Sequence, residues 1–256
     1  IERLRALDNL ESIFQAADGI MIARGDLGVE VAIERVPVVQ KQITRRANTL
    51  GKPVITATQM LESMTSSRRP TRAEATDVAN AILDGTDGVM LSGESAVGMF
   101  PVAATAMLAR IAAAIEPQRS RYQVREILDP CEAESSPRLA DVIAASVETV
   151  LEKISPVAIF VPTRSGATAR SISRFHPAQW IVAVSSEEAT CQRLQFSYGV
   201  FPVYEPDHPD DWNTFIRALL KAHGMAGNLV VLTEGPSRKR PETNNRLELI
   251  DLGAGS

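Results

Sequence analysis

The residues best suited to chemistry follow short apolar runs in the first half of the sequence. Asp26, Thr58 and Ser92 each come just after such a run, within the segments Arg-Gly-Asp, Thr-Gln and Ser-Gly-Glu. A carboxylate can bind a hard divalent cation, a hydroxyl can donate and accept hydrogen bonds, and glycine lets a ligand approach the backbone. Together these groups suit phosphoryl transfer, which requires positioning and charge neutralisation from a protein.

Repeated strand, loop and helix units are predicted to position these residues. The strands and the helices that follow them are expected, in chain order, at 18–23, 37–47, 52–57, 72–83, 87–91 and 101–115. Crossover helices of this length join parallel strands, and the unbroken apolar runs predict burial on both faces of the sheet. Consecutive loops at the carboxyl ends of such strands form the catalytic face of a (β/α)₈ barrel. Three units cannot close that barrel, so either the sheet is open or further strands lie upstream of residue 1.

The second half predicts a separate α/β sandwich. Its helices and strands alternate at 138–153, 157–161, 167–175, 180–184, 187–196, 200–204 and 211–222, followed by two closing strands at 229–232 and 246–252. Prolines and alternating charges interrupt the pattern between the halves, which is typical of a linker. We therefore divide the chain into a first domain at 1–117, a linker at 118–136 and a second domain at 137–256.

Composition excludes two classes of protein. The 256 residues carry 27 lysines and arginines against 31 acidic residues, a net charge of −4, which disfavours a polybasic nucleic-acid binder. The longest uncharged stretch, which contains 97–109 and lies between Glu94 and Arg110, is too short to span a membrane. Cys131 and Cys191 are too few for a disulfide framework and too far apart for a zinc knuckle, so inert thiols in a reducing cytoplasm are expected.

Five short segments of the first half, taken in their order along the chain, indicate a protein family. They are Ala-Arg-Gly-Asp-Leu-Gly-Val-Glu at 23–30, Ala-Thr-Gln-Met-Leu-Glu-Ser-Met at 57–64, Pro-Thr-Arg-Ala-Glu at 70–74, Asp-Val-Ala-Asn-Ala at 77–81 and Met-Leu-Ser-Gly-Glu at 90–94. Together they resemble the pyruvate kinase family. The resemblance covers the last third of the family's barrel, to about residue 117, and the whole C-terminal domain. It implies a partial (β/α)₈ barrel of the last three βα units, followed by an α/β three-layer sandwich.

The resemblance also implies an activity and the residues for it. Pyruvate kinases move a phosphoryl group from phosphoenolpyruvate to ADP in glycolysis, with Mg²⁺ or Mn²⁺ and with K⁺. By this resemblance Glu2 and Asp26 hold the divalent metal, while the K⁺ and nucleotide residues lie upstream of this chain. The amides of Gly25 and Asp26 open a short turn that receives the substrate carboxylate. Thr58 binds the same carboxylate and lies on the side from which the enol carbon is protonated, through a water relay near Ser92 and Glu94.

A second candidate site lies in the C-terminal domain. Thr163, Arg164, Ser165, Gly166 and Thr168 follow a predicted strand and open a helix, and in the family the matching loop holds the phosphate of an allosteric effector. The simpler interpretation is a helix N-cap with a tight turn. The basic run 238–240 either clamps a second phosphate or is a solvated hairpin tip, so the effector's identity stays open. The family also implies a homotetramer.

Three interpretations of function remain. The first is a pyruvate kinase, whose catalytic lysine would stand immediately before Ile1, so the 256 residues alone are expected to be inactive. The second is a related Mg²⁺-dependent barrel enzyme that uses phosphoenolpyruvate; it does not predict the Thr-Gln-Met-Leu-Glu-Ser-Met and Pro-Thr-Arg-Ala-Glu segments. The third is a non-catalytic module for effector binding or assembly.

Overall fold

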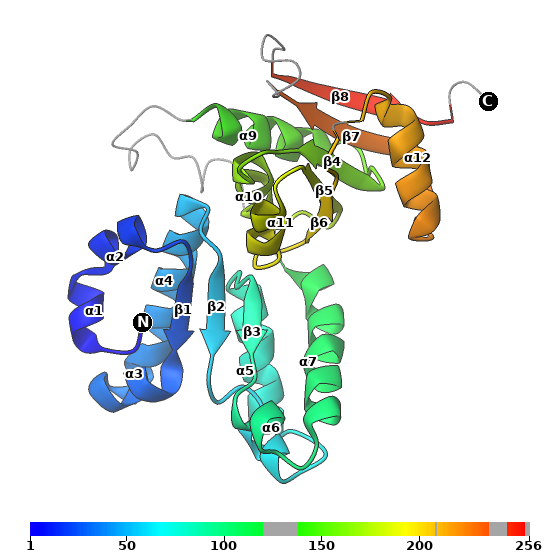
Figure 1. Ribbon diagram of the computed structural model, residues 1–256. Helices are drawn as coiled ribbons and strands as arrows, with labels where there is room; N and C mark the ends of the chain where they lie inside the picture. The colour runs from blue at the N-terminus through cyan, green and yellow to red at the C-terminus, as the bar shows by residue number, and fades with distance from the viewer. Residues whose placement is uncertain (120–137, 208, 236–244, 254–256) are drawn as a thin grey trace. The chain divides into compact units, whose positions relative to one another are not determined.

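The chain divides into two compact units, residues 1–120 and 121–256, in the computed structural model (Figure 1). The structure describes residues 1–119, 138–207, 209–235 and 245–253. Almost all of the expected linker, together with Cys131 and the basic run 238–240, lies outside the described residues, so the linker boundaries stay a prediction.

Unit 1 is built on a parallel sheet in the order β1-β2-β3, as the sequence predicted. The strands are β1 (Ile20–Ala23), β2 (Val54–Ala57) and β3 (Gly88–Met90). The register pairs Ala23 with Ala57, and Ala57 with Met90. The last residues of the three strands are therefore neighbours, and the segments that follow them start at one edge of the sheet.

The helices of unit 1 cover more of the chain than the sequence predicted. They are α1 (Leu4–Asp8), α2 (Leu10–Ala16), α3 (Arg24–Glu30), η1 (Ile33–Arg35), α4 (Val36–Leu50), η2 (Glu62–Thr65), α5 (Arg72–Leu83), α6 (Gly93–Ala96), α7 (Pro101–Ile115) and η3 (Glu116–Gln118). The expected turn at Gly25 and Asp26 is instead the first turn of α3. Leu27 and Val31, one helical turn apart, are both buried in the core beside β1 and favour this winding.

Burial of the unit 1 sheet differs from the prediction. Ile20, Ile22 and Val54 pack against α4 and α2 in one apolar cluster. Met21 instead remains 42% exposed, and Ile55 is half-buried. Since successive strand residues point to opposite faces, helices cover one face of the described sheet and leave the other more open. The expected burial on both faces is therefore met only in part, with Ala23 and Ala57 buried on the more open face.

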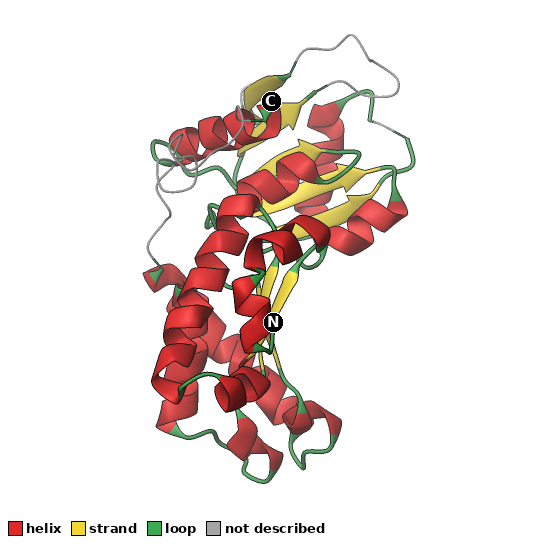
Figure 2. Cartoon of the chain, turned by 90° about the vertical axis from the view of Figure 1, so that its left-hand side faces the viewer, coloured by secondary structure: helices red, strands yellow, loops and turns green. Residues whose placement is uncertain are grey.

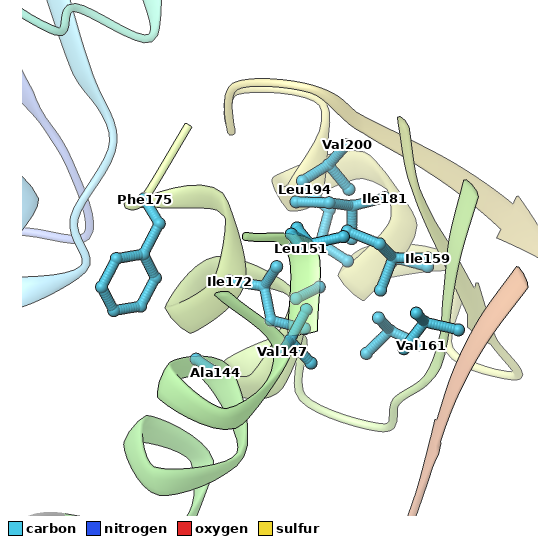
Figure 3. Packing of buried hydrophobic residues seen from close by; sticks show 13 residues of the cluster. Ala144, Val147, Leu151, Ile159, Val161, Ile172, Phe175, Ile181, Leu194 and Val200 are labelled. Atoms are coloured by element: carbon cyan, nitrogen blue, oxygen red, sulfur yellow. The ribbon is translucent and has the colours of Figure 1, made fainter. Parts of the chain in front are cut away.

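Unit 2 is a five-stranded sheet in the order β6-β5-β4-β7-β8, parallel except for the antiparallel β8. Its elements are α9 (Leu139–Leu151), β4 (Ala158–Pro162), α10 (Ala167–Ser173), β5 (Trp180–Ser185), α11 (Glu188–Leu194), β6 (Val200–Tyr204), α12 (Trp212–Ala222), β7 (Leu229–Glu234) and β8 (Arg246–Asp251). Figure 2 shows helices on both faces of this sheet. One face packs on α9, α10 and α11 around Val147, Ile172 and Leu194 (Figure 3), and the other packs on α12. The predicted three-layer sandwich is confirmed.

Two further expectations from the sequence concern the thiol of Cys191 and membrane-spanning helices. Cys191 is a buried free thiol, and burial, together with Glu188, raises its pKa above the ordinary value. A raised pKa leaves little thiolate at neutral pH, which agrees with the expected inert thiol. Among the helices in the described part of the chain, none combines the length and apolar character needed to cross a membrane.

Candidate active site

The ends of β1 and β2 are joined by a side chain predicted to bind substrate. The Gly25 amide donates a 2.8 Å hydrogen bond to Thr58 Oγ1, and Thr58 Oγ1 donates in turn to the Ala57 carbonyl oxygen at 2.7 Å. Two of the predicted substrate-binding residues, 33 positions apart in sequence, are therefore in direct contact. Both bonds engage groups that could otherwise face an anion, so a bound carboxylate would take the place of this internal pairing.

Asp26 lies in the first turn of α3, one residue beyond Gly25, and its side chain is exposed. Acidic residues in the first helical turn are stabilised by the free backbone N–H groups there. Asp26 therefore presents a solvent-accessible carboxylate next to the Gly25 and Thr58 contact, as the sequence predicted from its place after the strand.

Glu2 reaches the same end of the sheet by another route. The Ile1 nitrogen donates to the Met21 carbonyl oxygen, and the Ala23 amide donates to the Ile1 carbonyl oxygen at 3.0 Å. This is the bonding pattern of a parallel bridge centred on Ile22, so Ile1 lines the free edge of β1 and Glu2 follows where the strand ends. The Glu2 side chain is 53% exposed, with Arg3 as a 3.9 Å neighbour.

The donor set formed by Glu2 and Asp26 can be compared with the needs of a metal. Magnesium is commonly held by one or two carboxylates, with water and substrate oxygens completing its shell. Two accessible carboxylates at one sheet end fit that requirement. Within residues 1–119, 138–207, 209–235 and 245–253, no three histidine, cysteine or acidic side chains gather as a complete protein cage. Glu2 and Asp26 are thus of the kind that would hold Mg²⁺ with water and other oxygens completing its shell.

The end of β3 contributes a buried carboxylate, Glu94, which was expected from the sequence near the proton relay. Glu94 is 2% exposed and accepts hydrogen bonds from the amides of Leu61, at 3.0 Å, and Ser92, at 2.8 Å. It therefore connects the segment after β2 to the segment after β3. With both oxygens held by backbone amides, Glu94 is placed to organise the loops and is a poor candidate for the proton relay near Ser92.

The Pro-Thr-Arg-Ala-Glu segment has a mainly architectural role. Thr71 and Glu74 form a capping box at the start of α5, and Glu74 also accepts hydrogen bonds from the amide and hydroxyl of Ser63. Burial alone would raise the pKa of Glu74, but the hydrogen bonds from Ser63 and Thr71 outweigh it and hold the pKa below the usual value. The ionised carboxylate thus anchors the loop after Thr58 to α5.

One functional candidate was missed by the sequence analysis. Arg24, the residue between β1 and Gly25, is only 8% exposed, and its guanidinium pairs with the Asp77 carboxylate on α5 at 2.7 Å. The Arg-Gly-Asp motif contains this arginine, but an arginine beside an acidic residue is more often a solvated surface charge. Its burial depends on α5, whose residue Asp77 lies 53 positions after Arg24 in the chain.

The candidate effector loop of unit 2 folds as a helix-start turn. The Gly166 amide donates to Thr163 Oγ1 at 3.0 Å, and the Ala167 amide donates to Ser165 Oγ at 3.4 Å. Gly166 has φ of 80°, and a Cβ there would lie 3.0 Å from a Leu194 methyl, so glycine is required. Arg164 and Ser165 are exposed, and Thr168 is half-buried in α10. The N-cap of α10 is Gly166, without a side-chain capping hydrogen bond, so the contacts match the expected tight turn but not an N-cap by serine or threonine. They leave binding of an effector untested.

Both units match known protein families. A family model described as "Pyruvate kinase, barrel domain" matches residues 1–105, and one described as "Pyruvate kinase, alpha/beta domain" matches residues 141–250. Pyruvate kinase of Thermococcus litoralis is 48% identical over 250 residues, which are 95% of this chain and 52% of that protein. Pyruvate kinase of Bacillus licheniformis is 42% identical over 248 residues, 95% of this chain and 42% of that protein.

Solved structures give the same result. The crystal structure of a pyruvate kinase from Cryptosporidium parvum superimposes with a TM-score of 0.88 at 36% sequence identity. That match covers 98% of this chain and 50% of the other. The chain thus spans about half the length of the proteins it matches.

Proposed function

This chain belongs to the pyruvate kinase family, and from that membership we propose that the full-length protein transfers a phosphoryl group from phosphoenolpyruvate to ADP, forming pyruvate and ATP. The observation that carries the proposal is the 2.8 Å contact between the Gly25 amide and Thr58 Oγ1, made beside the exposed carboxylate of Asp26. Donors for a substrate carboxylate and a ligand for a divalent cation thus occur at one end of the sheet.

Glu2 and Asp26 would hold Mg²⁺, or Mn²⁺, at this end of the sheet. A divalent cation bound there supplies neutralisation of phosphate charge during the transfer. The family also implies K⁺, and we assign no residue of this chain to it. Residues of this chain fix the positions of the two carboxylates. The hydrogen bonds of Ile1 to β1 place Glu2, and helix α3 places Asp26.

We assign substrate binding to the Gly25 N–H and the Thr58 hydroxyl, which make hydrogen bonds within the protein when no substrate is bound. The Gly25 N–H bonds to Thr58 Oγ1, and the Thr58 hydroxyl hydrogen bonds to Ala57. Both donors can turn to a carboxylate that enters between them, with the Asp26 amide as a third donor. Charge-assisted bonds to such an anion are stronger than the neutral ones they replace, so the exchange is favourable.

The same threonine suits the protonation of the enol carbon. A hydroxyl is too weak an acid to protonate carbon alone, so we assign Thr58 to orient the water that delivers the proton. Glu94 is excluded from our relay because its oxygens accept the amides of Leu61 and Ser92. Residues 1–119 contain no histidine that could serve as an imidazole acid in this unit.

We also propose how the protein is regulated, how it assembles and where it is located. We assign the loop from Thr163 to Thr168 to the phosphate of an effector, and we propose a homotetramer in the cytoplasm, where phosphoenolpyruvate and ADP are available. Family membership favours this reaction over a different barrel enzyme that uses phosphoenolpyruvate. A non-catalytic module for effector binding or assembly is the second candidate.

The direct test is a Mg²⁺ titration of pyruvate formation by the full-length protein. Asp26→Asn removes one anionic ligand and should raise the Mg²⁺ concentration for half-maximal activity by about tenfold or more. Asp18→Asn, an exposed carboxylate before β1, is the matched control and should leave the titration unchanged. Wild-type protein that forms no pyruvate at any Mg²⁺ concentration would favour the non-catalytic module.

A second assay addresses the 256 residues by themselves. Because they span about half the length of their relatives, we expect no pyruvate from this chain assayed alone. Turnover by the isolated chain would show that its own residues suffice and would contradict the upstream assignment of the catalytic lysine.

A further inference from the structure

The buried guanidinium of Arg24 makes an unusual set of contacts with the backbone after β2. Arg24 Nη2 donates to the Thr58 carbonyl oxygen at 2.8 Å and to the Gln59 carbonyl oxygen at 3.4 Å, while Nε donates to the Ala57 carbonyl oxygen at 3.4 Å. One side chain from the end of β1 therefore contacts three consecutive carbonyl groups at the end of β2.

Those carbonyl groups belong to a strained turn. Thr58 has φ of 66° and Gln59 has φ of 54°, so two successive residues other than glycine adopt the left-handed conformation. Side chains with a Cβ disfavour this conformation, and it persists only where the surroundings hold it. Among the described residues, only Thr58, Gln59 and His176 have positive φ without being glycine.

Side chains from two other helices pair with the guanidinium of Arg24. Asp77 on α5 lies 2.7 Å from Nη1, and Gln40 on α4 accepts from the same nitrogen at 3.3 Å. Gln40 in turn donates to Asp84, at the end of α5, at 2.9 Å. A buried guanidinium needs such partners, so α4 and α5 fix the place from which Arg24 can reach the turn.

We infer that Arg24, oriented by Asp77, is a positioning residue that holds the left-handed turn at Thr58 and Gln59 and so keeps the Thr58 hydroxyl on the Gly25 amide. The link to catalysis rests on the proposed function, in which Thr58 contacts the substrate. Arg24 itself does not contact the substrate in this proposal. It acts by fixing the backbone from which the Thr58 side chain projects.

The positioning step can be tested without any activity. The Gly25 amide is bonded to Thr58 Oγ1, so its hydrogen exchange reports whether that hydroxyl stays in place. Arg24→Met keeps the length of the side chain and removes its donors, and we expect Gly25 to exchange about tenfold faster, once the new neighbour's inductive effect is corrected. Arg46→Met, which breaks the ion pair of Arg46 with Glu11 on the surface, is the matched control and should leave Gly25 unchanged.

A glycine substitution separates support of the turn from general packing. Glycine adopts positive φ without steric cost, so Gln59→Gly lowers the need for outside support. Combined with Arg24→Met, it should return the exchange of Gly25 toward the wild-type rate. If Arg24 were needed only for core packing, Gln59→Gly would restore nothing, and that result would overturn the inference.

Kinetics of the full-length protein test the link to Thr58. Arg24→Met should lower kcat by about tenfold, and adding it to Thr58→Ala should cause little further loss, since both changes remove the same positioned hydroxyl. Fully multiplicative losses would contradict the inference. If Arg24→Met does not fold, Asp77→Asn replaces it in both assays, because it weakens the pair and keeps all the carbonyl contacts available.

The outcomes separate the two proposals. Wild-type protein without turnover would contradict the proposed function, while the exchange of Gly25 would still decide whether Arg24 holds the turn. An active enzyme whose Gly25 exchange ignores Arg24→Met would contradict the positioning role and leave the proposed reaction standing.

Discussion

Thr58 illustrates how much one side chain at a strand end can do. Its hydroxyl is bonded to the Gly25 amide from one strand and to its own neighbour Ala57, so the free protein keeps both donors ready at one point. Its left-handed backbone turns the side chain toward β1 and is not expected for a β-branched residue. Conformational strain at a residue that we assign to the substrate agrees with the general clustering of strain at functional sites.

Solvent exchange into pyruvate tests the role of the Thr58 hydroxyl. Thr58→Ala removes the group that we assign to orient water, so incorporation of deuterium into the pyruvate methyl group should slow by about a hundredfold. Thr58→Ser keeps the hydroxyl and should retain most of the exchange rate. The measurement is proton NMR of pyruvate in D₂O with the full-length protein. An unchanged rate in Thr58→Ala would remove Thr58 from the protonation step.

Individual residues differed in how well their sequence context predicted their use. Asp26 follows a strand and is exposed, as expected from its position after an apolar run, and its use as a metal ligand stays a prediction. Arg24 shares a motif with Asp26, and Glu94 ends the motif after β3, but the two are only 8% and 2% exposed. Sequence proximity does not separate a ligand from a buried structural charge, because burial is decided by elements that are distant in the chain.

At the scale of elements, unit 2 depends on an ionic contact between α9 and the end of α10. Asp141 on α9 accepts a 3.0 Å hydrogen bond from Ser171 and lies 3.0 Å from the guanidinium of Arg174. Arg138 donates to the same carboxylate at 3.0 Å. Asp141 is 6% exposed and Arg174 is 4% exposed, so loss of the carboxylate would remove a counter-charge from a buried guanidinium.

This contact predicts a dependence of stability on pH. Burial favours neutral Asp141, but the Arg138 hydrogen bond and the Arg174 charge outweigh it and hold the Asp141 pKa below the ordinary value. A folded-state pKa below the unfolded one gives stability that is complete above the unfolded pKa, about 3.9, and is lost as pH falls through the folded pKa.

Asp141→Asn should therefore lower the free energy of unfolding by about 1–3 kcal/mol at pH 7. The difference from wild type should shrink as the pH falls below about 4, since Asp141 is then protonated in the unfolded wild-type chain and, at still lower pH, in the folded one. Urea denaturation at several pH values measures this, with the exposed Asp210→Asn as control. An equal difference at pH 7 and pH 3 would show that the charge of Asp141 is not the source of the stability.

Helix α3 shows where prediction of elements failed. The segment 24–30 contains two glycines and was expected to form a turn, yet it is helical. Leu27 and Val31 each bury against the core beside β1, and this tertiary packing outweighs the low helix propensity of glycine. By contrast, α5 and α7 begin and end at the predicted residues, because each has a clear start signal and a long amphipathic pattern.

At the scale of the whole molecule, unit 2 offers a test that does not require catalysis. If the loop from Thr163 to Thr168 binds a phosphorylated effector, the ligand should raise the melting temperature by mass action. The gain is about 2.7 kcal/mol at a concentration 100 times the dissociation constant. Fructose bisphosphate, AMP and ribose phosphate are the probes, and the one that binds identifies the effector class.

Variants complete this melting experiment. Thr163→Ala removes a hydroxyl from the loop and should reduce the shift, while Thr149→Ala, on the exposed face of α9, should not. The absence of a shift with all three ligands would leave the loop with the role of a tight turn before α10, which its hydrogen bonds describe.

Two α/β units and the common edge of the three strand ends of unit 1 were determined by the sequence alone, because strand and helix patterns depend on neighbours within a few turns. The tertiary structure decided that Thr58 bonds to the amide of Gly25, that Glu94 joins two loops and that Arg24 is buried behind the turn. Each of these contacts joins residues more than thirty positions apart. They depend on the register of the sheet and on the helices behind it, which local patterns do not encode.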